Sequence, residues 1–195
     1  MKVIGDLSRA DISVLHRFGN KSKRILEFGA GGSTHIFAQC EEPEHIVSVE
    51  TAQEWIDITQ ARMATLDNPK PVHFINYDIH ALQDRHGSNW DLIFIDGMDN
   101  LRHHSAHRTW EDLNIGGVMM FHDTRRAQDY KNALSIITAH YNQIESVLCN
   151  YAGSNITVIT KKEYAPWENW NKTEDKPMWA YGHDMNQITL WEDTL

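Results

Sequence analysis

The chain has 195 residues, of which 41% are hydrophobic and 23% charged, a balance that suits one globular domain and excludes disorder throughout. Its 27 acidic and 18 basic residues give a net charge of −9, which repels a phosphate backbone, so we do not expect nucleic acid as a partner. No apolar run approaches the ~20 residues that a membrane helix needs, and the N-terminus lacks the apolar core of a signal peptide. Cys40 and Cys149 make neither a disulfide framework nor a paired metal motif. We therefore expect a cytoplasmic protein with no membrane partner.

Hydrophobic periodicity and turn residues predict that helices and strands alternate along most of the chain. Helices are expected over residues 7–19, from Ser33 or Thr34 onward, and over 52–66, 104–114 and 127–141. Strands are expected over residues 24–29, 46–50, 72–77, 91–96 and 118–122, with two closing strands near 144–149 and 156–160. The pattern predicts an α/β fold with a mainly parallel sheet.

Local patterns also predict where individual helices begin and end. Ser8 with Asp11, and Thr51 with Glu54, have the spacing of capping boxes at helix starts. Glycines at 116 and 117 are expected to end the helix over residues 104–114, ahead of the strand that follows.

A glycine-rich turn follows the first strand and reads Glu27-Phe28-Gly29-Ala30-Gly31-Gly32-Ser33. Glycines in such a turn let a ligand approach the backbone, because no Cβ blocks it. The next strand ends at Glu50, about 20 residues after Gly29, where an acid can bind both hydroxyls of a ribose. These features predict a cofactor that contains a nucleoside.

The same turn argues against a dinucleotide. The dinucleotide fingerprint needs a third glycine at position 34, where this chain has Thr34. Glu27, two residues before the first glycine, suits a cationic amino group better than a pyrophosphate. The methionine part of S-adenosylmethionine (SAM) carries such a group.

With these motifs the sequence resembles the class I SAM-dependent methyltransferases over about residues 20–162. The resemblance rests on residues 27–33, 48–50, 76–79, 91–97 and 116–124, and the last two segments are similar to the small O-methyltransferases related to catechol and macrolide-sugar methyltransferases. It implies a Rossmann-like, doubly wound, three-layer fold whose seven-stranded sheet has an antiparallel last strand. Residues 1–162 would form this domain, with 163–195 as an aromatic extension.

The resemblance also implies roles for individual residues. Gly29 and Gly31 would lie against the methionine portion of SAM, with Glu27 near its amino group and Glu50 at the ribose. Asp78 and Ile79 would flank the adenine, although Asp78 could equally cap a helix at the end of its strand.

Asp96 and Asp123 close adjacent parallel strands at the edge of the sheet where α/β proteins bind ligands. Methyl transfer to a hydroxyl needs a general base or a divalent cation that lowers the hydroxyl pKa, and two carboxylates suit Mg²⁺ or another divalent cation. Metal-dependent relatives have Asn or Asp directly after the second carboxylate, where this chain has Thr124. Without a metal, Asp96 would hold the amino group of SAM and His122 would act as the base.

Two further segments leave alternatives open. His103 and His107 are four residues apart, so on a helix they could chelate a transition metal, or they are surface or acceptor-pocket residues. Trp167, Trp170, Trp179 and Trp191 give the C-terminal segment an aromatic character, which predicts packing on the sheet edge or on a partner in a homodimer, or a lid over the acceptor.

Taken together, the sequence predicts O-methylation of a small hydroxylated acceptor. The alternatives are a SAM-binding protein that transfers no methyl group and an NAD-linked oxidoreductase.

Overall fold

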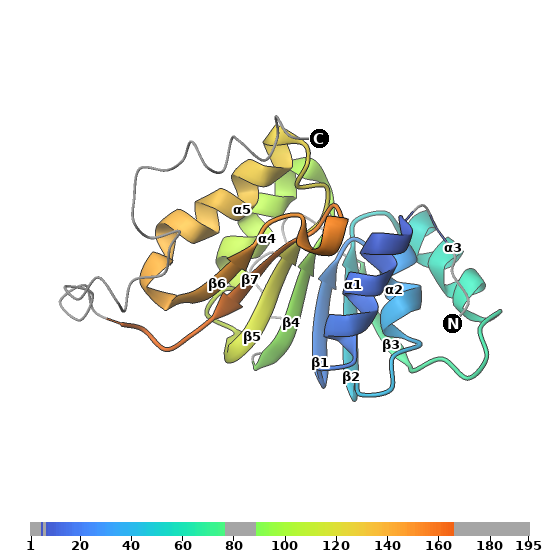
Figure 1. The fold of residues 1–195 in the computed structure, drawn as a ribbon. Helices are drawn as coiled ribbons and strands as arrows, with labels where there is room; N and C mark the ends of the chain where they lie inside the picture. The colour runs from blue at the N-terminus through green and yellow to red at the C-terminus, as the bar shows by residue number, and fades with distance from the viewer. Residues whose placement is uncertain (1–4, 6, 77–88, 166–195) are drawn as a thin grey trace.

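The structure, a computed structural model, describes residue 5 and residues 7–76 and 89–165. Its centre is a seven-stranded sheet in the order β3-β2-β1-β4-β5-β7-β6 (Figure 1). The strands are β1 (Arg24–Phe28), β2 (His45–Glu50), β3 (Val72–Asn76), β4 (Trp90–Ile95), β5 (Leu113–Phe121), β6 (Ile144–Leu148) and β7 (Thr157–Lys161).

The direction of the strands confirms the predicted fold class. β1 to β5 pair in parallel, whereas β7 runs antiparallel to both of its neighbours, β5 and β6. All the residues of β4 from 92 to 95 are fully buried, as expected for a parallel strand that has helices on both faces.

Helices cover both faces of the sheet and make three layers (Figure 1). The helices are α1 (Arg9–Gly19), α2 (Gly32–Phe37), α3 (Gln53–Met63), α4 (Asp99–Thr109) and α5 (Ala127–Ala139). One core cluster joins α1 and α2 to the sheet, and a second joins α4 and α5 to its opposite face. The carboxyl ends of the parallel strands therefore lie at one edge, between these two helical layers.

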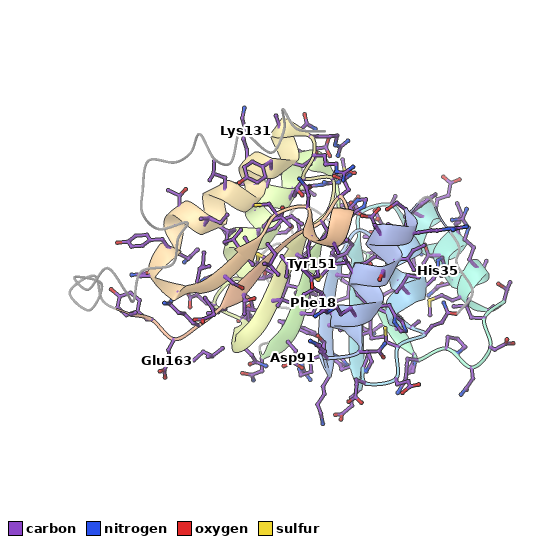
Figure 2. All side chains as sticks on the ribbon, viewed as in Figure 1. Phe18, His35, Asp91, Lys131, Tyr151 and Glu163 are labelled. Atoms are coloured by element: carbon purple, nitrogen blue, oxygen red, sulfur yellow. The ribbon has the colours of Figure 1, made fainter. Side chains whose placement is uncertain are left out.

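The start of α1 is built as predicted and is tied to the far end of the chain. Ser8 and Asp11 form the capping box, and Asp11 Oδ1 also accepts the backbone N–H of Asn155 at 2.7 Å. At the other end of α1, the Phe18 ring packs edge-on against Tyr151, with 5.9 Å between ring centroids; both side chains are labelled in Figure 2. These contacts hold the segment before β7 against α1.

The helix expected over residues 104–114 is instead α4, which begins five residues earlier and ends five residues earlier. Its buried face includes Arg102, Ser105 and Thr109 beside Leu101 and Ala106. Because three of these five buried residues are polar, the sequence lacks the apolar spacing that marks the buried face of a helix. Residues 113 and 114, expected at the end of that helix, belong to β5.

The glycines at 116 and 117 do not end a helix, because they lie inside β5. Between Trp90 and Leu92 the register of β4 against β5 jumps from Leu113 to Val118, so β5 carries an irregularity here. Gly116 has φ +80°, and Gly117 leaves no room for a Cβ beside Asp91 O. The glycines therefore permit a bulge in β5 beside the first residues of β4.

The capping box expected at Thr51 is also absent from α3. Its N-cap is Ala52, which has no side-chain cap, and the Thr51 hydroxyl instead donates to Glu50 Oε1 at 3.1 Å. The helix ends at Met63, three residues before the end expected at residue 66.

None of the helices in the described ranges is long and apolar enough to span a membrane. Asp78, Ile79 and the aromatic segment from residue 166 onward lie outside the described residues.

Candidate functional site

The glycine turn brings the ends of three strands together. Gly29, directly after β1, has φ +97° and donates its N–H to Val49 O of β2 at 2.8 Å. A Cβ at Gly29 would lie 2.7 Å from the backbone of Asp96, directly after β4. Only glycine fits both the left-handed backbone and this close approach.

Glu27 lies beneath the turn, fully buried. Its carboxylate accepts hydrogen bonds from the hydroxyls of Ser33, Thr34 and Ser48, the last at 2.7 Å. Burial raises the pKa of Glu27 to about 7, although the three hydroxyls act in the opposite direction. In this structure Glu27 organises the turn and the start of α2, and its predicted contact with an amino group stays a prediction.

Glu50 joins the end of β2 to the same turn. Its Oε2 accepts the backbone N–H of Ala30 at 3.1 Å, and Oε1 accepts those of Thr51 and Ala52 at 2.7 and 3.0 Å. The carboxylate is thus fixed at the rim of the turn without a cationic partner among these contacts.

An open hollow of about 390 Å³ lies over the turn and the strand ends. Its wall includes residues 29–33, Glu50, Trp55, Asp96, His122 and Asp123. A recess of about 20 Å³ adjoins Glu50 and is lined in part by Val49, Met98 and Leu101. We call residues 29–33 together with Glu50 the glycine cradle.

Asp96, His122 and Asp123 meet on the other wall of the hollow, at the ends of β4 and β5. His122 Nδ1 lies 3.2 Å from Asp96 Oδ1 and 3.4 Å from Asp123 Oδ1. Asp123 has φ +59°, an uncommon left-handed conformation for a residue with a side chain, and such strained residues are enriched at functional sites.

A buried arginine from α4 lies behind the two carboxylates. Arg102 Nη2 lies 3.1 Å from Asp96 Oδ1 and 3.6 Å from Asp123 Oδ2, and Nη1 lies 2.8 Å from Asp129 Oδ1. The guanidinium also donates to Gly97 O at 2.8 Å and to His122 O at 3.2 Å. Arg102 therefore ties the ends of β4 and β5 to α4 and α5.

Both oxygens of Asp123 have further partners. Oδ2 lies 2.7 Å from Arg126 Nη2, and Oδ1 accepts from Asn155 Nδ2 at 2.9 Å. Arg126 Nε also pairs with the buried Asp129 at 2.6 Å. We call Asp96, Arg102, His122, Asp123, Arg126 and Asp129 the strand-end network.

His122 is largely buried among acids. Burial acts to lower its pKa, but the hydrogen bond to Asp96 and the charges of Asp96, Asp123 and Asp11 outweigh it, so the pKa is raised. Its Nε2 is buried without a hydrogen bond and lies 3.8 Å from Asp11 Oδ2. The imidazole thus favours the protonated form.

Solved structures with a similar architecture include methyltransferases. A methyltransferase-like protein from Silicibacter pomeroyi matches with a TM-score of 0.62 and 16% identity, over 90% of this chain and 99% of that chain. The N-methyltransferase NodS from Bradyrhizobium japonicum, in complex with S-adenosyl-L-homocysteine (SAH), matches with a TM-score of 0.54 and 14% identity, over 78% and 86% of the two chains. An O-methyltransferase from Bacillus cereus, in complex with SAH, matches with a TM-score of 0.61 and 19% identity, over 80% and 83%. The chain has the fold of the SAM-dependent methyltransferases. No protein-family model and no curated protein matches the sequence.

On this methyltransferase fold, the glycine cradle fits a nucleoside cofactor. The cradle is open, it offers a carboxylate whose position is fixed, and an apolar recess adjoins that carboxylate. Gly29, Gly31, Glu50, Asp96, His122 and Asp123 all line this hollow, as the sequence predicted that they would share one site. Their roles toward a ligand stay predictions.

The strand ends fit a divalent cation less well. Ligand atoms of Asp96, His122 and Asp123 lie within 4.8 Å of one another, which is a plausible spacing for a metal site. The position of the third ligand in metal-dependent relatives is Thr124, whose hydroxyl is buried and bonded to Thr157 Oγ1 at 2.9 Å. Thr124 therefore faces β7, and the carboxylates are already paired with arginines.

His103 and His107 lie on α4 with 4.4 Å between ring centroids, and they face α5. His103 Nδ1 and His107 Nε2 both lie near Ser135 Oγ, at 3.2 and 3.0 Å. Neither residue lines the hollow formed by the described residues, so the site gives them no contact with an acceptor.

Sequence reasoning missed the residues that support the site from a distance. Asp11 was recognised only as part of a capping box, and Arg102 was one basic residue in a histidine-rich segment. Asn155 carried no signal, and Trp55 was expected only on the face of a helix, although it donates its indole N–H to Ala30 O in the cradle.

Proposed function

We propose that the chain is a SAM-dependent methyltransferase that methylates an oxygen atom of a small hydroxylated acceptor. The observation that carries the proposal is the shared hollow, which has the glycine cradle on one wall and Asp96 on the other. Cofactor and acceptor would thus meet in one space, and proximity and orientation supply most of the catalysis in methyl transfer.

The cradle residues would bind and orient the cofactor. Glu50 would accept hydrogen bonds from two ribose hydroxyls, while the backbone of Gly29 and Gly31 would lie against the methionine portion. When bound, SAM supplies a methyl group on a sulfonium, which leaves as a neutral thioether.

Asp96 is the residue best placed to contact an acceptor. Its Oδ1 is held by Arg102 and His122, whereas Oδ2 takes part in none of these contacts and the residue lines the hollow. Asp96 Oδ2, which has no such partner among the described residues, could accept the proton of an acceptor hydroxyl as the methyl group arrives, or hold the amino group of the cofactor. His122 and Arg102 fix the carboxylate in either case.

Calorimetric titration with SAM tests the proposal. The native protein should bind SAM, and Glu50→Gln should weaken binding about 100-fold, because the negative charge and one of the two acceptor oxygens are lost. Glu54→Gln is the matched control, since Glu54 is an exposed acid on the following helix, and it should bind as the native protein does. A native protein that does not bind SAM would overturn the proposal.

SAM-binding without methyl transfer is the second candidate. It is favoured by Asp123, whose two oxygens are both paired within the protein and so are not free to act on an acceptor. Release of SAH with any hydroxylated acceptor from a panel of sugars and phenols would refute this second candidate, whereas release with amines alone would move the acceptor atom to nitrogen.

A further inference from the structure

We propose that the Arg102 guanidinium takes the place of a divalent cation between Asp96 and Asp123, so that this site works without a metal. The inference rests on the proposed function, because it concerns how that site holds its carboxylates. Arg102 would be a positioning residue, since it acts through Asp96.

One guanidinium nitrogen of Arg102 lies near both carboxylates. Nη2 lies 3.1 Å from Asp96 Oδ1 and 3.6 Å from Asp123 Oδ2, so it bridges the two carboxylates from behind. A cation shared by the same carboxylates would have to compete with a positive charge in their immediate neighbourhood.

The arginine is also locked in place. Its side chain is only 6% exposed, and it pairs with Asp129, which is itself 1% exposed, at 2.8 Å. It also donates to the backbone carbonyls of Gly97 and His122. Such a forked, buried guanidinium cannot lose its proton or swing away at low cost.

The oxygens of Asp123 and Thr124 that could bind a cation already have partners within the protein. Asp123 Oδ2 is held by Arg126 at 2.7 Å, and Asp123 Oδ1 accepts from Asn155 at 2.9 Å. Thr124, at the position of a third oxygen ligand, has its hydroxyl bonded to Thr157. Mg²⁺ and Mn²⁺ prefer several oxygen ligands. Of the four carboxylate oxygens of Asp96 and Asp123, only Asp96 Oδ2 takes part in none of these contacts.

The experiment measures Mn²⁺ binding directly, by the loss of the electron paramagnetic resonance signal of free Mn²⁺. Native protein treated with EDTA and then dialysed should show no binding up to about 1 mM Mn²⁺, a concentration near the dissociation constant of a weak divalent-cation site. Arg102→Leu combined with Asp129→Asn removes the buried pair together and should raise Mn²⁺ affinity at least about tenfold. Arg108→Leu, an exposed arginine on the same helix, should behave as the native protein does.

Two results would overturn the inference. One is Mn²⁺ binding by the native protein that disappears in Asp96→Asn, a comparison that needs no Arg102 variant and so holds even if the double variant fails to fold. The other is a folded double variant that binds Mn²⁺ no better than the native protein does. A SAM titration of the same EDTA-treated protein separates the two proposals, because absent SAM binding defeats the proposed function whatever the Mn²⁺ signal shows.

Discussion

The glycine cradle and three members of the strand-end network, Asp96, His122 and Asp123, line one hollow, but the cradle and the network are held together by different interactions. The cradle is held by backbone N–H groups and hydroxyls, and neither its acid, Glu50, nor the buried Glu27 beneath it has an arginine or lysine partner among these hydrogen bonds. The network is held by ion pairs, in which Arg102 and Arg126 are shared among Asp96, Asp123 and Asp129.

This difference determines which groups of the site are available to a ligand. A neutral scaffold leaves Glu50 available to a polar ligand, whereas a network that neutralises its own acids leaves little free charge and few free lone pairs.

Replacing Gly29 with alanine should damage the cradle most. The new Cβ would meet the Asp96 backbone at 2.7 Å while φ stays at +97°, so we expect a loss of about 3 kcal/mol in the free energy of unfolding, together with loss of SAM binding. Gly116→Ala is the control, because Gly116 also has positive φ but nothing within 4 Å of a Cβ, and it should cost about 1 kcal/mol. Urea denaturation measures both, and equal losses in the two variants would contradict the close approach.

Glu27→Gln should change how stability depends on pH. The pKa of Glu27 is raised from 4.5 to about 7 in the folded protein, so this group's stabilising contribution is present below pH 4.5 and is lost as the pH rises through about 7. Relative to the variant, the native protein should lose about 3 kcal/mol across that window. Urea denaturation at several pH values measures the difference, and parallel pH curves for the two proteins would show that Glu27 titrates normally.

Asp11→Asn should lower the pKa of His122. The Asp11 carboxylate lies 3.8 Å from His122 Nε2 and is one of three acids, with Asp96 and Asp123, that raise this pKa against the effect of burial. Because the pKa is raised in the folded state, the protonated imidazole stabilises the fold below its unfolded pKa, and this stabilisation is lost as the pH rises through the folded pKa.

Nuclear magnetic resonance titration of the His122 ring measures the shift. Asp57→Asn serves as control, since Asp57 is exposed on α3, where its carboxylate accepts from Gln53 Nε2 at 2.8 Å. An unchanged His122 pKa in Asp11→Asn would show that the charge of Asp11 on α1 does not influence His122.

Trp55→Phe should have the smallest effect. It removes the indole N–H that donates to Ala30 O but keeps an aromatic ring over the cradle, so a loss of about 1 kcal/mol is expected. SAM affinity should fall roughly fivefold, as a titration would show. Unchanged affinity would mean that this hydrogen bond does not shape the cradle for the cofactor.

The two walls also differ in how far the sequence predicts them. The cradle is encoded locally, since Gly29, Gly31 and Glu50 follow two strands whose pairing the alternation of elements already implies. The sheet and the shared position of Asp96, His122 and Asp123 follow from the same rule, because parallel strands end at one edge.

The strand-end network depends on contacts that no local pattern carries. Asp11, Arg102 and Asn155 lie far apart in the chain, and they meet only after α1, α4 and the segment before β7 have packed. α4 itself was misplaced because it buries Arg102, Ser105 and Thr109, which are polar residues on the face where apolar ones are expected.

A crystal structure of the protein grown with SAH would test the central claim most directly. The account predicts the ribose hydroxyls within hydrogen-bond distance of the Glu50 carboxylate, the amino-acid portion along residues 29–31, and the sulfur facing Asp96 across the hollow. Ligand bound elsewhere, or density in the hollow that leaves Glu50 without contact to the ribose, would contradict it.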